Sequence, residues 1–330
     1  MYTPLMKKKK IVSSMLQLLE TSSHQPEMSS FVITCISHED VLNLEKRAEI
    51  SKKINAVLSS DGYEVESEQQ SSENAFDIYV ENSNTISLKE FHLLLKEVID
   101  SVKDADLIVQ LNNKYRQKKL IVFDMDSTLI YQEVIELIAA YANVEDKVRE
   151  ITERAMNNEL DFKQSLQERV KLLKGLKIDD LYDQIKSKLE ITKGVPELCQ
   201  ALHNNGCKLA VLSGGFIPFA KFIKEQLNLD YAEANILETD SDGLLTGFTK
   251  GTVVDGQYKA ETLLRLCKEF DIPVEASCMV GDGGNDLPAM NVAGFGVAWN
   301  AKPRVQELAP SKLNTKSMIN LLHVFGYLEI

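Results

Sequence analysis

The chain has 330 residues, 44% of them hydrophobic and 26% charged, which is the composition of a folded protein long enough for two domains. Its net charge of -12 argues against the basic face that a nucleic acid requires, so we expect a small-molecule or protein partner. No apolar run reaches about 18 residues, which excludes a membrane span. The five cysteines are scattered without a CxxC pair, so no zinc site is expected and a reduced, cytoplasmic compartment is predicted.

Residues 1–28 combine the lysine run Lys7–Lys10 with a short apolar stretch and a polar tail. An organelle-targeting leader is one interpretation, but a flexible N-terminal segment is the simpler one. Met28, just before the first strand-like run, would serve as an alternative start.

Residues 29–112 alternate between the periodicities of strand and helix in the order βαββαβ, which is ferredoxin-like. The expected elements lie at 31–37, 41–58, 63–68, 75–80, 88–102 and 106–111. This segment resembles ACT-type modules that bind amino acids, and a serine effector is one interpretation. A docking or dimerisation module without a ligand, giving a homodimer, is at least as good an interpretation.

The central strand is expected at Leu120–Phe123, an all-apolar run that delivers Asp124 and Asp126 to its end. Further strands at 208–212, 277–280 and 295–298, separated by helices, predict a doubly wound, Rossmann-like parallel sheet of the α/β class. This core is expected to occupy 119–330. Helical periodicity over about 131–193 indicates a helical cap inserted into it, and a turn at 240–243 predicts a hairpin.

Polar motifs follow three of the expected strands. They are DMDST at 124–128, SGG at 213–215 and GDGGND at 281–286. Because parallel strands end on one edge of the sheet, we expect Asp124, Asp126, Ser213, Asp282 and Asp286 to converge there. Taken alone, SGG is more often a tight turn and GDGGND a glycine-rich connection. Together they place several carboxylates in one pocket, and such oxygen ligands suit Mg2+.

Phosphoryl transfer is the chemistry that this arrangement favours. Beside Mg2+, Asp124 could attack phosphorus, and Asp126 could protonate the leaving oxygen. Ser213, the Gly214 N–H and Lys259 would then stabilise the charge on the phosphoryl oxygens. Lys259 taken alone is far more often a solvated surface residue.

The cap contains two residues that bear on the substrate. Arg169 lies on an apolar helical stripe, which is costly without an anionic partner. An ion pair within the cap is one explanation, and capture of a substrate carboxylate is another. Glu133 is either a solvated helix residue or a partner for a substrate ammonium group. An arginine and a glutamate beside a phosphate site would together describe a phosphorylated amino acid.

DMDSTLIYQE, SGG, the downstream lysine and GDGGND resemble the successive motifs of the haloacid dehalogenase superfamily, over about residues 119–325. The specific form is similar to members that hydrolyse O-phospho-L-serine, the last step of phosphorylated serine biosynthesis. Transfer of the phosphoryl group to another acceptor or a broader phosphomonoesterase are the alternatives within catalysis. A sensing or scaffolding protein is disfavoured, since no motif position is missing.

The resemblance also implies roles residue by residue. It implies Asp124 as nucleophile, Asp126 as acid/base, Mg2+ at Asp124, Asp126 (through its carbonyl) and Asp282, support from Asp286, and phosphate or substrate contacts at Glu133, Met156, Phe162, Arg169, Ser213, Gly214, Lys259 and Asn285. One departure is Asn157–Asn158, where the family commonly has a glycine.

Overall fold

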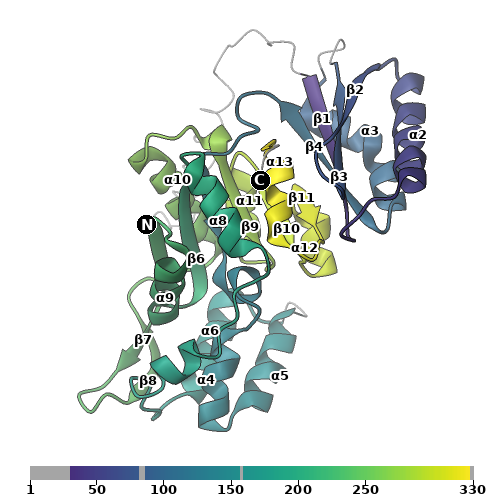
Figure 1. Cartoon of the computed structure of the whole chain (residues 1–330). Helices are drawn as coiled ribbons and strands as arrows, with labels where there is room; N and C mark the ends of the chain where they lie inside the picture. The colour runs from purple at the N-terminus through teal and green to yellow at the C-terminus, as the bar shows by residue number, and fades with distance from the viewer. Residues whose placement is uncertain (1–29, 82–85, 157–158, 328–330) are drawn as a thin grey trace, which may run out of the picture.

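The computed structural model describes residues 30–81, 86–156 and 159–327, apart from the side chain of Met156. These residues form two sheets, one of four strands and one of seven. Figure 1 shows the smaller sheet at one end of the molecule and a group of helices at the opposite end, with the larger sheet between them.

The smaller sheet belongs to the N-terminal part of the chain. Its elements are β1 (Ser30–Ser37), α2 (Leu44–Ser60), β2 (Val65–Gln70), β3 (Ala75–Val80), α3 (Leu88–Ser101) and β4 (Ala105–Asn112). The strands are antiparallel in the order β2-β3-β1-β4. Phe31 of β1 stacks on Phe91 of α3, with ring centroids 4.0 Å apart, so this part has its own apolar core. The ferredoxin-like order expected from the sequence is compatible with this arrangement.

The larger sheet forms the centre of the molecule and has the order β11-β10-β9-β5-β6-β7-β8. Its strands are β5 (Leu120–Phe123), β6 (Lys208–Phe216), β7 (Tyr231–Thr239), β8 (Leu245–Lys250), β9 (Ser277–Gly281), β10 (Gly296–Trp299) and β11 (Ser311–Leu313). Neighbouring strands are parallel except β7 and β8, which form the hairpin expected around 240–243. The predicted doubly wound parallel sheet is therefore confirmed.

Helices cover this sheet and connect its strands. They are α8 (Val195–Asn204), α9 (Ile217–Leu227), α10 (Gly256–Glu269), α11 (Leu287–Val292), α12 (Pro303–Leu308) and α13 (Leu321–Val324). The sequence indicated β7 only as an arm of the hairpin, without placing it in the parallel sheet, and it did not indicate β11. Apolar and polar residues are mixed in β7, and β11 has three residues, so neither shows the apolar run of a buried strand.

Of the helices between β5 and β6, those that precede α8 form the expected cap. They are α4 (Val134–Ala142), α5 (Glu145–Met156), α6 (Phe162–Leu172) and α7 (Tyr182–Lys186). In Figure 1, α4 to α6 lie at the end of the molecule opposite to α2 and α3. The chain passes between core and cap twice, near residues 130 and 191, and these two connecting segments pair with each other. Ile130 and Ile191 form an antiparallel β-bridge, and the Tyr131 N–H donates to the Glu190 carbonyl at 3.1 Å.

A buried arginine joins the two parts of the molecule. Arg116 lies in the connector between β4 and β5, and it forms an ion pair of 2.7 Å with Asp77 of β3. Its guanidinium also donates to the backbone carbonyls of His323 and Val324 in α13, at 3.0 and 3.3 Å. Figure 1 shows α13 lying between the two sheets. Because the arginine is buried and paired on both sides, the N-terminal sheet is packed against the core.

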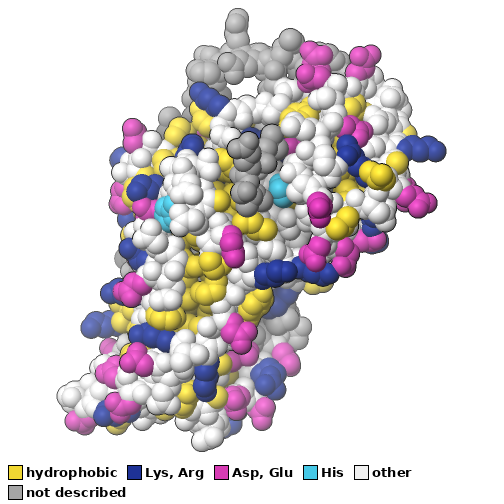
Figure 2. Space-filling model, viewed as in Figure 1, with side chains coloured by type: hydrophobic (Ala, Val, Ile, Leu, Met, Phe, Trp, Pro, Cys, Tyr) yellow, Lys and Arg dark blue, Asp and Glu magenta, His cyan; other side chains and the backbone are white. Residues whose placement is uncertain are grey.

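Basic and acidic side chains are interspersed on the face of the molecule shown in Figure 2, without one broad basic field. Among the described residues, no helix combines the length and apolar character needed to cross a membrane.

Candidate active site

At the carboxyl ends of β5 and β9, two of the predicted aspartates contact one buried lysine. Lys259, in the first turns of α10, is fully buried, and its Nζ lies 2.9 Å from Asp124 Oδ1 and 2.7 Å from Asp286 Oδ1. Burial lowers the pKa of Lys259, but the two carboxylates outweigh this effect, and its pKa is raised overall. The lysine is therefore a charged member of the site, and the surface interpretation is wrong.

Asp124, Asp282 and Asp286 form a cluster in which one carboxylate oxygen from each lies within 4.8 Å of the others. Burial, and next the charge of Asp124, raise the pKa of Asp282 to about 7 and also raise the pKa of Asp286. Three crowded carboxylates with a single lysine beside them carry excess negative charge. Hard oxygen donors at this spacing fit a divalent cation such as Mg2+.

Asp126 lies in a tight turn at Met125–Leu129, where the chain changes direction after β5. Its Oδ1 accepts a hydrogen bond of 3.2 Å from the Val134 N–H, at the start of α4. Burial raises the pKa of Asp126 well above its usual value, and Glu133 and Asp124 raise it further. A carboxyl group with a raised pKa can hold a proton and donate it.

The SGG motif forms an irregular end of β6, because the pairing with β7 shifts between Ser213 and Phe216. The buried Ser213 Oγ accepts a hydrogen bond of 2.8 Å from the Gly215 N–H. Phe162, the first residue of α6, lies so close to Gly214 that a Cβ there would approach the ring to 2.7 Å. The Asn285 side chain is also near, 3.5 Å from the same position. The cap therefore closes directly onto this loop.

Glu133 and Arg169 lie on the cap side of the site. Glu133 Oε1 accepts a hydrogen bond of 2.7 Å from Ser127 Oγ. Burial lowers the pKa of the Arg169 guanidinium, whereas Glu133 and Asp126 oppose the shift, so this arginine faces the acidic groups of the site. Arg169 Nε donates to the Ser165 carbonyl within its own helix at 3.3 Å. The Met156 side chain and residues 157–158 lie outside the described residues.

Sequence reasoning missed several residues that hold this site together. Ser127 has a left-handed backbone (φ 52°), which is uncommon for serine, and its hydroxyl fixes Glu133. Thr128 Oγ1 donates to Asp282 Oδ1 at 3.2 Å. Both belong to the DMDST motif, so their position could have drawn attention to them. A third residue, Asn235 of β7, donates a hydrogen bond to the Gly214 carbonyl and belongs to none of the sequence motifs, so nothing in the sequence pointed to it.

A contact between cap and core was also missed. Lys163, next to Phe162 on α6, forms an ion pair of 2.8 Å with Asp255. Asp255 caps the N-terminus of α10 by accepting from the Tyr258 N–H at 2.8 Å, one turn before Lys259. The pair thus links the beginning of the cap helix to the helix that carries the buried lysine.

Comparisons with known proteins identify the family to which this fold belongs. The family model of haloacid dehalogenase-like hydrolases matches residues 118–294. Phosphoserine phosphatase from Saccharomyces cerevisiae is 63% identical over 303 residues, which cover 92% of this chain and 98% of that protein. Phosphoserine phosphatase from Haemophilus influenzae is 47% identical over 209 residues, covering 63% of this chain and 66% of that protein.

Two solved structures extend the comparison. A haloacid dehalogenase-family hydrolase from Salmonella enterica serovar Typhi has a TM-score of 0.74 at 27% identity, covering 90% of this chain and 99% of that one. A substrate-bound phosphoserine phosphatase has a TM-score of 0.59 at 41% identity, covering 62% of this chain and 97% of that one. The chain therefore belongs to the haloacid dehalogenase-like hydrolases. Within them it is a member of the phosphoserine phosphatase family, because the identity to the yeast protein spans nearly all of both chains.

Proposed function

We propose that this enzyme hydrolyses O-phospho-L-serine to L-serine and phosphate, with Mg2+ and through an aspartyl-phosphate intermediate. The observation that carries the proposal is the buried Lys259 holding Asp124 at the carboxyl edge of the sheet, under a cap that presents Glu133 and Arg169. The names of the similar proteins support the substrate. A related structure described as a phospho-aspartyl intermediate analogue of phosphoserine phosphatase supports the covalent route.

In the first step, a carboxylate oxygen of Asp124 bonds to phosphorus while the bond from phosphorus to the serine oxygen breaks. Asp124 Oδ1 is engaged by Lys259 and by the Met125 N–H at 2.7 Å, so Oδ2 is assigned the attack. Asp126, whose pKa is raised, gives its proton to the leaving oxygen. Serine leaves as the neutral alcohol.

In the second step, Asp126 takes a proton from water, and the water oxygen attacks the phosphorus of the aspartyl-phosphate. The bond between phosphorus and Asp124 breaks, which releases phosphate and restores the carboxylate. Ser213, the Gly214 N–H, Lys259 and Asn285 bind the phosphoryl oxygens in both steps.

Mg2+ would be held by Asp124, Asp282 and the backbone carbonyl of Asp126, where it would offset the charge of the phosphate group. Asp286 supports this site by its contacts with Lys259 and with the Gly283 N–H at 3.0 Å. The proximity of the Asp286 carboxylate to Asp124 and Asp282 also makes it a candidate ligand in its own right.

Recognition of serine is assigned to the cap. Arg169 pairs with the substrate carboxylate and Glu133 with its ammonium group, while Phe162 and Met156 close over the bound molecule. In the Arg169→Ala variant, kcat/KM should fall much further for phosphoserine than for p-nitrophenyl phosphate, which lacks the carboxylate. An equal loss for both substrates would contradict this assignment.

The reaction itself is tested by measuring phosphate release from a panel of phosphorylated small molecules, with Mg2+ and with EDTA. We expect phosphoserine to be the best substrate, EDTA to abolish turnover, and alcohol acceptors to leave phosphate release undiminished. The Asp124→Asn variant should be inactive and should form no phosphoenzyme. Full activity of this variant would rule out the covalent mechanism.

Several broader assignments accompany this proposal. The catalytic unit is assigned to residues 119–330 with its cap at about 131–193, the ACT-like unit to 29–112, and a flexible segment to 1–28, which lies outside the described residues. A homodimer, a serine effector at the N-terminal unit, a cytoplasmic location and a place in serine biosynthesis remain predictions.

A further inference from the structure

The β7–β8 hairpin projects from the edge of the central sheet. β7 pairs with β6 over residues 231–235 and with β8 over residues 236–239, so the outer part of the hairpin consists of its own two strands. In Figure 1 it extends from the sheet beside cap helix α6. Its outer face is open to solvent, since Phe248 is 52% exposed. A two-stranded hairpin is only marginally stable alone, so this one depends on what its inner side contacts.

The inner side of the hairpin is attached to the cap just after α6. The Gly175 N–H donates to the Leu245 carbonyl at 2.8 Å, and the Leu245 N–H donates to the Leu176 carbonyl at 2.9 Å. The Leu245 side chain is buried in the hydrophobic core. Gly247 also approaches the cap closely, because a Cβ there would lie 3.3 Å from the Lys174 Cβ. Main-chain hydrogen bonds and apolar burial together make this a firm attachment.

The first turn of α6 contacts the core more weakly. Phe162 lies against Gly214, and Lys163 pairs with Asp255 at 2.8 Å, with 62% of the lysine side chain exposed. Within the described part of the chain, no backbone hydrogen bond joins this turn of α6 to the core. An exposed ion pair is screened by solvent and contributes little. The first turn of α6 is therefore the end that separates from the core more easily.

The cap must open for a substrate to enter and for the product to leave. Asp124 is 6% exposed and Lys259 is fully buried, so neither reaches solvent while the cap is closed. Opening at one end of α6 exposes them, provided that the cap keeps a fixed support elsewhere.

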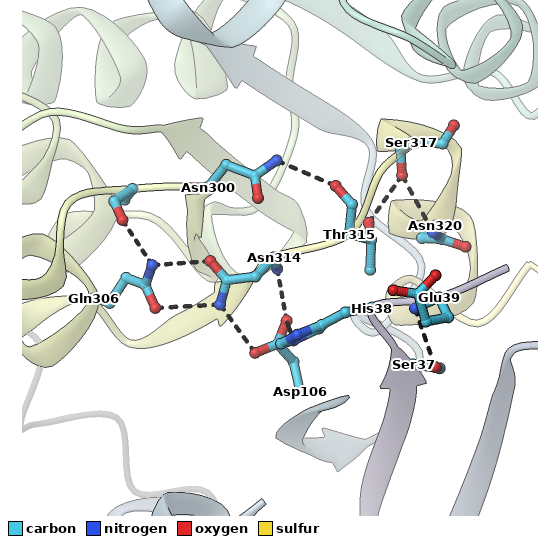
Figure 3. Close-up of polar contacts among 11 residues, drawn as sticks. Ser37, His38, Glu39, Asp106, Asn300, Gln306, Asn314, Thr315, Ser317 and Asn320 are labelled. Carbon is cyan, nitrogen blue, oxygen red and sulfur yellow. Dashed lines mark hydrogen bonds and ion pairs between the residues drawn. The ribbon is translucent and has the colours of Figure 1, made fainter. Parts of the chain in front are cut away.

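The connecting segments near residues 130 and 191 give one such support, because their core side is anchored. The Met318 N–H donates to the Lys193 carbonyl at 2.9 Å. The segment that contains Met318 is itself held by the polar network in Figure 3, where Asp106 of β4 accepts from the Asn314 N–H at 2.6 Å. The base of the cap thus stays with the core, and the motion belongs to the cap helices.

We propose that the β7–β8 hairpin is a second hinge of the cap. The cap turns about two attachments, the connecting segments near residues 130 and 191 and the hairpin at Leu245. Only the end of α6 that carries Phe162 and Lys163 leaves the core. Since α6 has 11 residues and is about 16 Å long, a small rotation at the hairpin displaces its first turn much further. This hinge does not depend on which phosphate ester is the substrate.

Crosslinks at the two ends of α6 test the hinge. Lys174→Cys with Gly247→Cys joins the cap to the hairpin, and Lys163→Cys with Gln257→Cys joins the first turn of α6 to the first turn of α10. The five native cysteines are buried, so a short thiol crosslinker reacts with the introduced pairs. Each double variant is compared with itself before and after crosslinking, so strain from a cysteine at Gly247, where φ is 88°, does not affect the comparison.

The hairpin crosslink should leave kcat and kcat/KM within about twofold, whereas the crosslink at the first turn of α6 should lower turnover about tenfold or more, because substrate and product are then trapped. Both phosphoserine and p-nitrophenyl phosphate are used as substrates. Loss of turnover on crosslinking the hairpin, or unchanged turnover on crosslinking the first turn of α6, would overturn the proposal.

Hydrogen exchange of the unmodified protein gives an independent test, because the amides of Gly175 and Leu245 are the donors in the hairpin contact. If this contact persists while the cap opens, inorganic phosphate with Mg2+ should slow these two amides no more than it slows the amides of β5. A selective slowing of Gly175 and Leu245 would show that the contact breaks in the open form, and the hinge would then be wrong. A protein that keeps these exchange rates but does not hydrolyse phosphoserine would contradict the proposed function instead.

Discussion

The side chain of Asn235 donates a hydrogen bond of 2.8 Å to the carbonyl oxygen of Gly214 and accepts one of 2.8 Å from the Val254 N–H. Asn235 is buried in β7, between the SGG end of β6 and the segment that leads into α10. One amide therefore fixes the distance between the Gly214 loop and the helix that carries Lys259. We regard it as a positioning residue for the phosphate site.

Replacing Asn235 with alanine should lower kcat about 10- to 100-fold, because both phosphate-binding segments lose their common support. The loss should be similar for phosphoserine and p-nitrophenyl phosphate, since the two share the phosphoryl group. Gln110→Ala is the control: it removes another buried amide, which donates to the Val324 carbonyl at 2.8 Å far from the phosphate site. Equal kinetic losses in both variants would show that Asn235 acts only through stability.

Alanine at Gly214 should prevent the cap from closing fully, because its Cβ would meet the Phe162 ring at 2.7 Å. We expect kcat/KM to fall about 10- to 100-fold. Gly284→Ala is the control, since a Cβ at that position meets nothing within 4 Å. In the Phe162→Ala background, the added methyl group should cost much less. Additive effects of the two substitutions would contradict a direct contact.

The positions of the aspartates could be predicted because they follow apolar runs such as Leu120–Phe123. Residues that directly follow a buried parallel strand must lie at its carboxyl edge, whatever the rest of the chain does. The central position of Lys259 could not be predicted in this way, because a single lysine in a sequence is more often on the surface. Its burial depends on Asp286, 27 residues away, and periodicity does not report such a pairing.

Contacts between segments far apart in the chain were beyond sequence reasoning for a related reason. The role of Asn235 depends on two backbone groups, in Gly214 and Val254, that come together only in the folded chain. A surface cleft lined by residues that include His38, Tyr131, Thr192, Asn300 and Thr315 likewise brings together segments that are far apart in the sequence. No spacing rule relates such positions, since each segment obeys its own local pattern.

The ion pair between Lys163 and Asp255 should help the cap to close, and Lys163→Met should therefore raise KM for phosphoserine. The effect should be small, about two- to fivefold, because the lysine is 62% exposed and screened by solvent. Added salt should raise KM of the wild type toward that of the variant while changing the variant little. Equal salt dependence in both proteins would show that this pair does not assist closure.

Lys118, just before β5, provides a test of stability against pH. It is 4% exposed, its Nζ donates to the Glu275 carbonyl at 2.9 Å, and burial lowers its pKa from 10.5 to about 8. Between these two values the unfolded chain holds more protons than the folded one, so this residue makes the free energy of unfolding rise with pH. The cost of burying the charged lysine is fully present below about pH 8 and is relieved as the pH rises toward 10.5.

Replacing Lys118 with methionine should remove that cost and stabilise the protein at pH 7 by about 1–3 kcal/mol. Urea unfolding at a series of pH values should show the advantage of the variant shrinking between about pH 8 and 10.5, as the wild-type lysine loses its proton. Lys119→Met, which removes the neighbouring, less buried ammonium group, controls for the change in net charge. An advantage for Lys118→Met that stays constant across this range would show that the lysine does not titrate there.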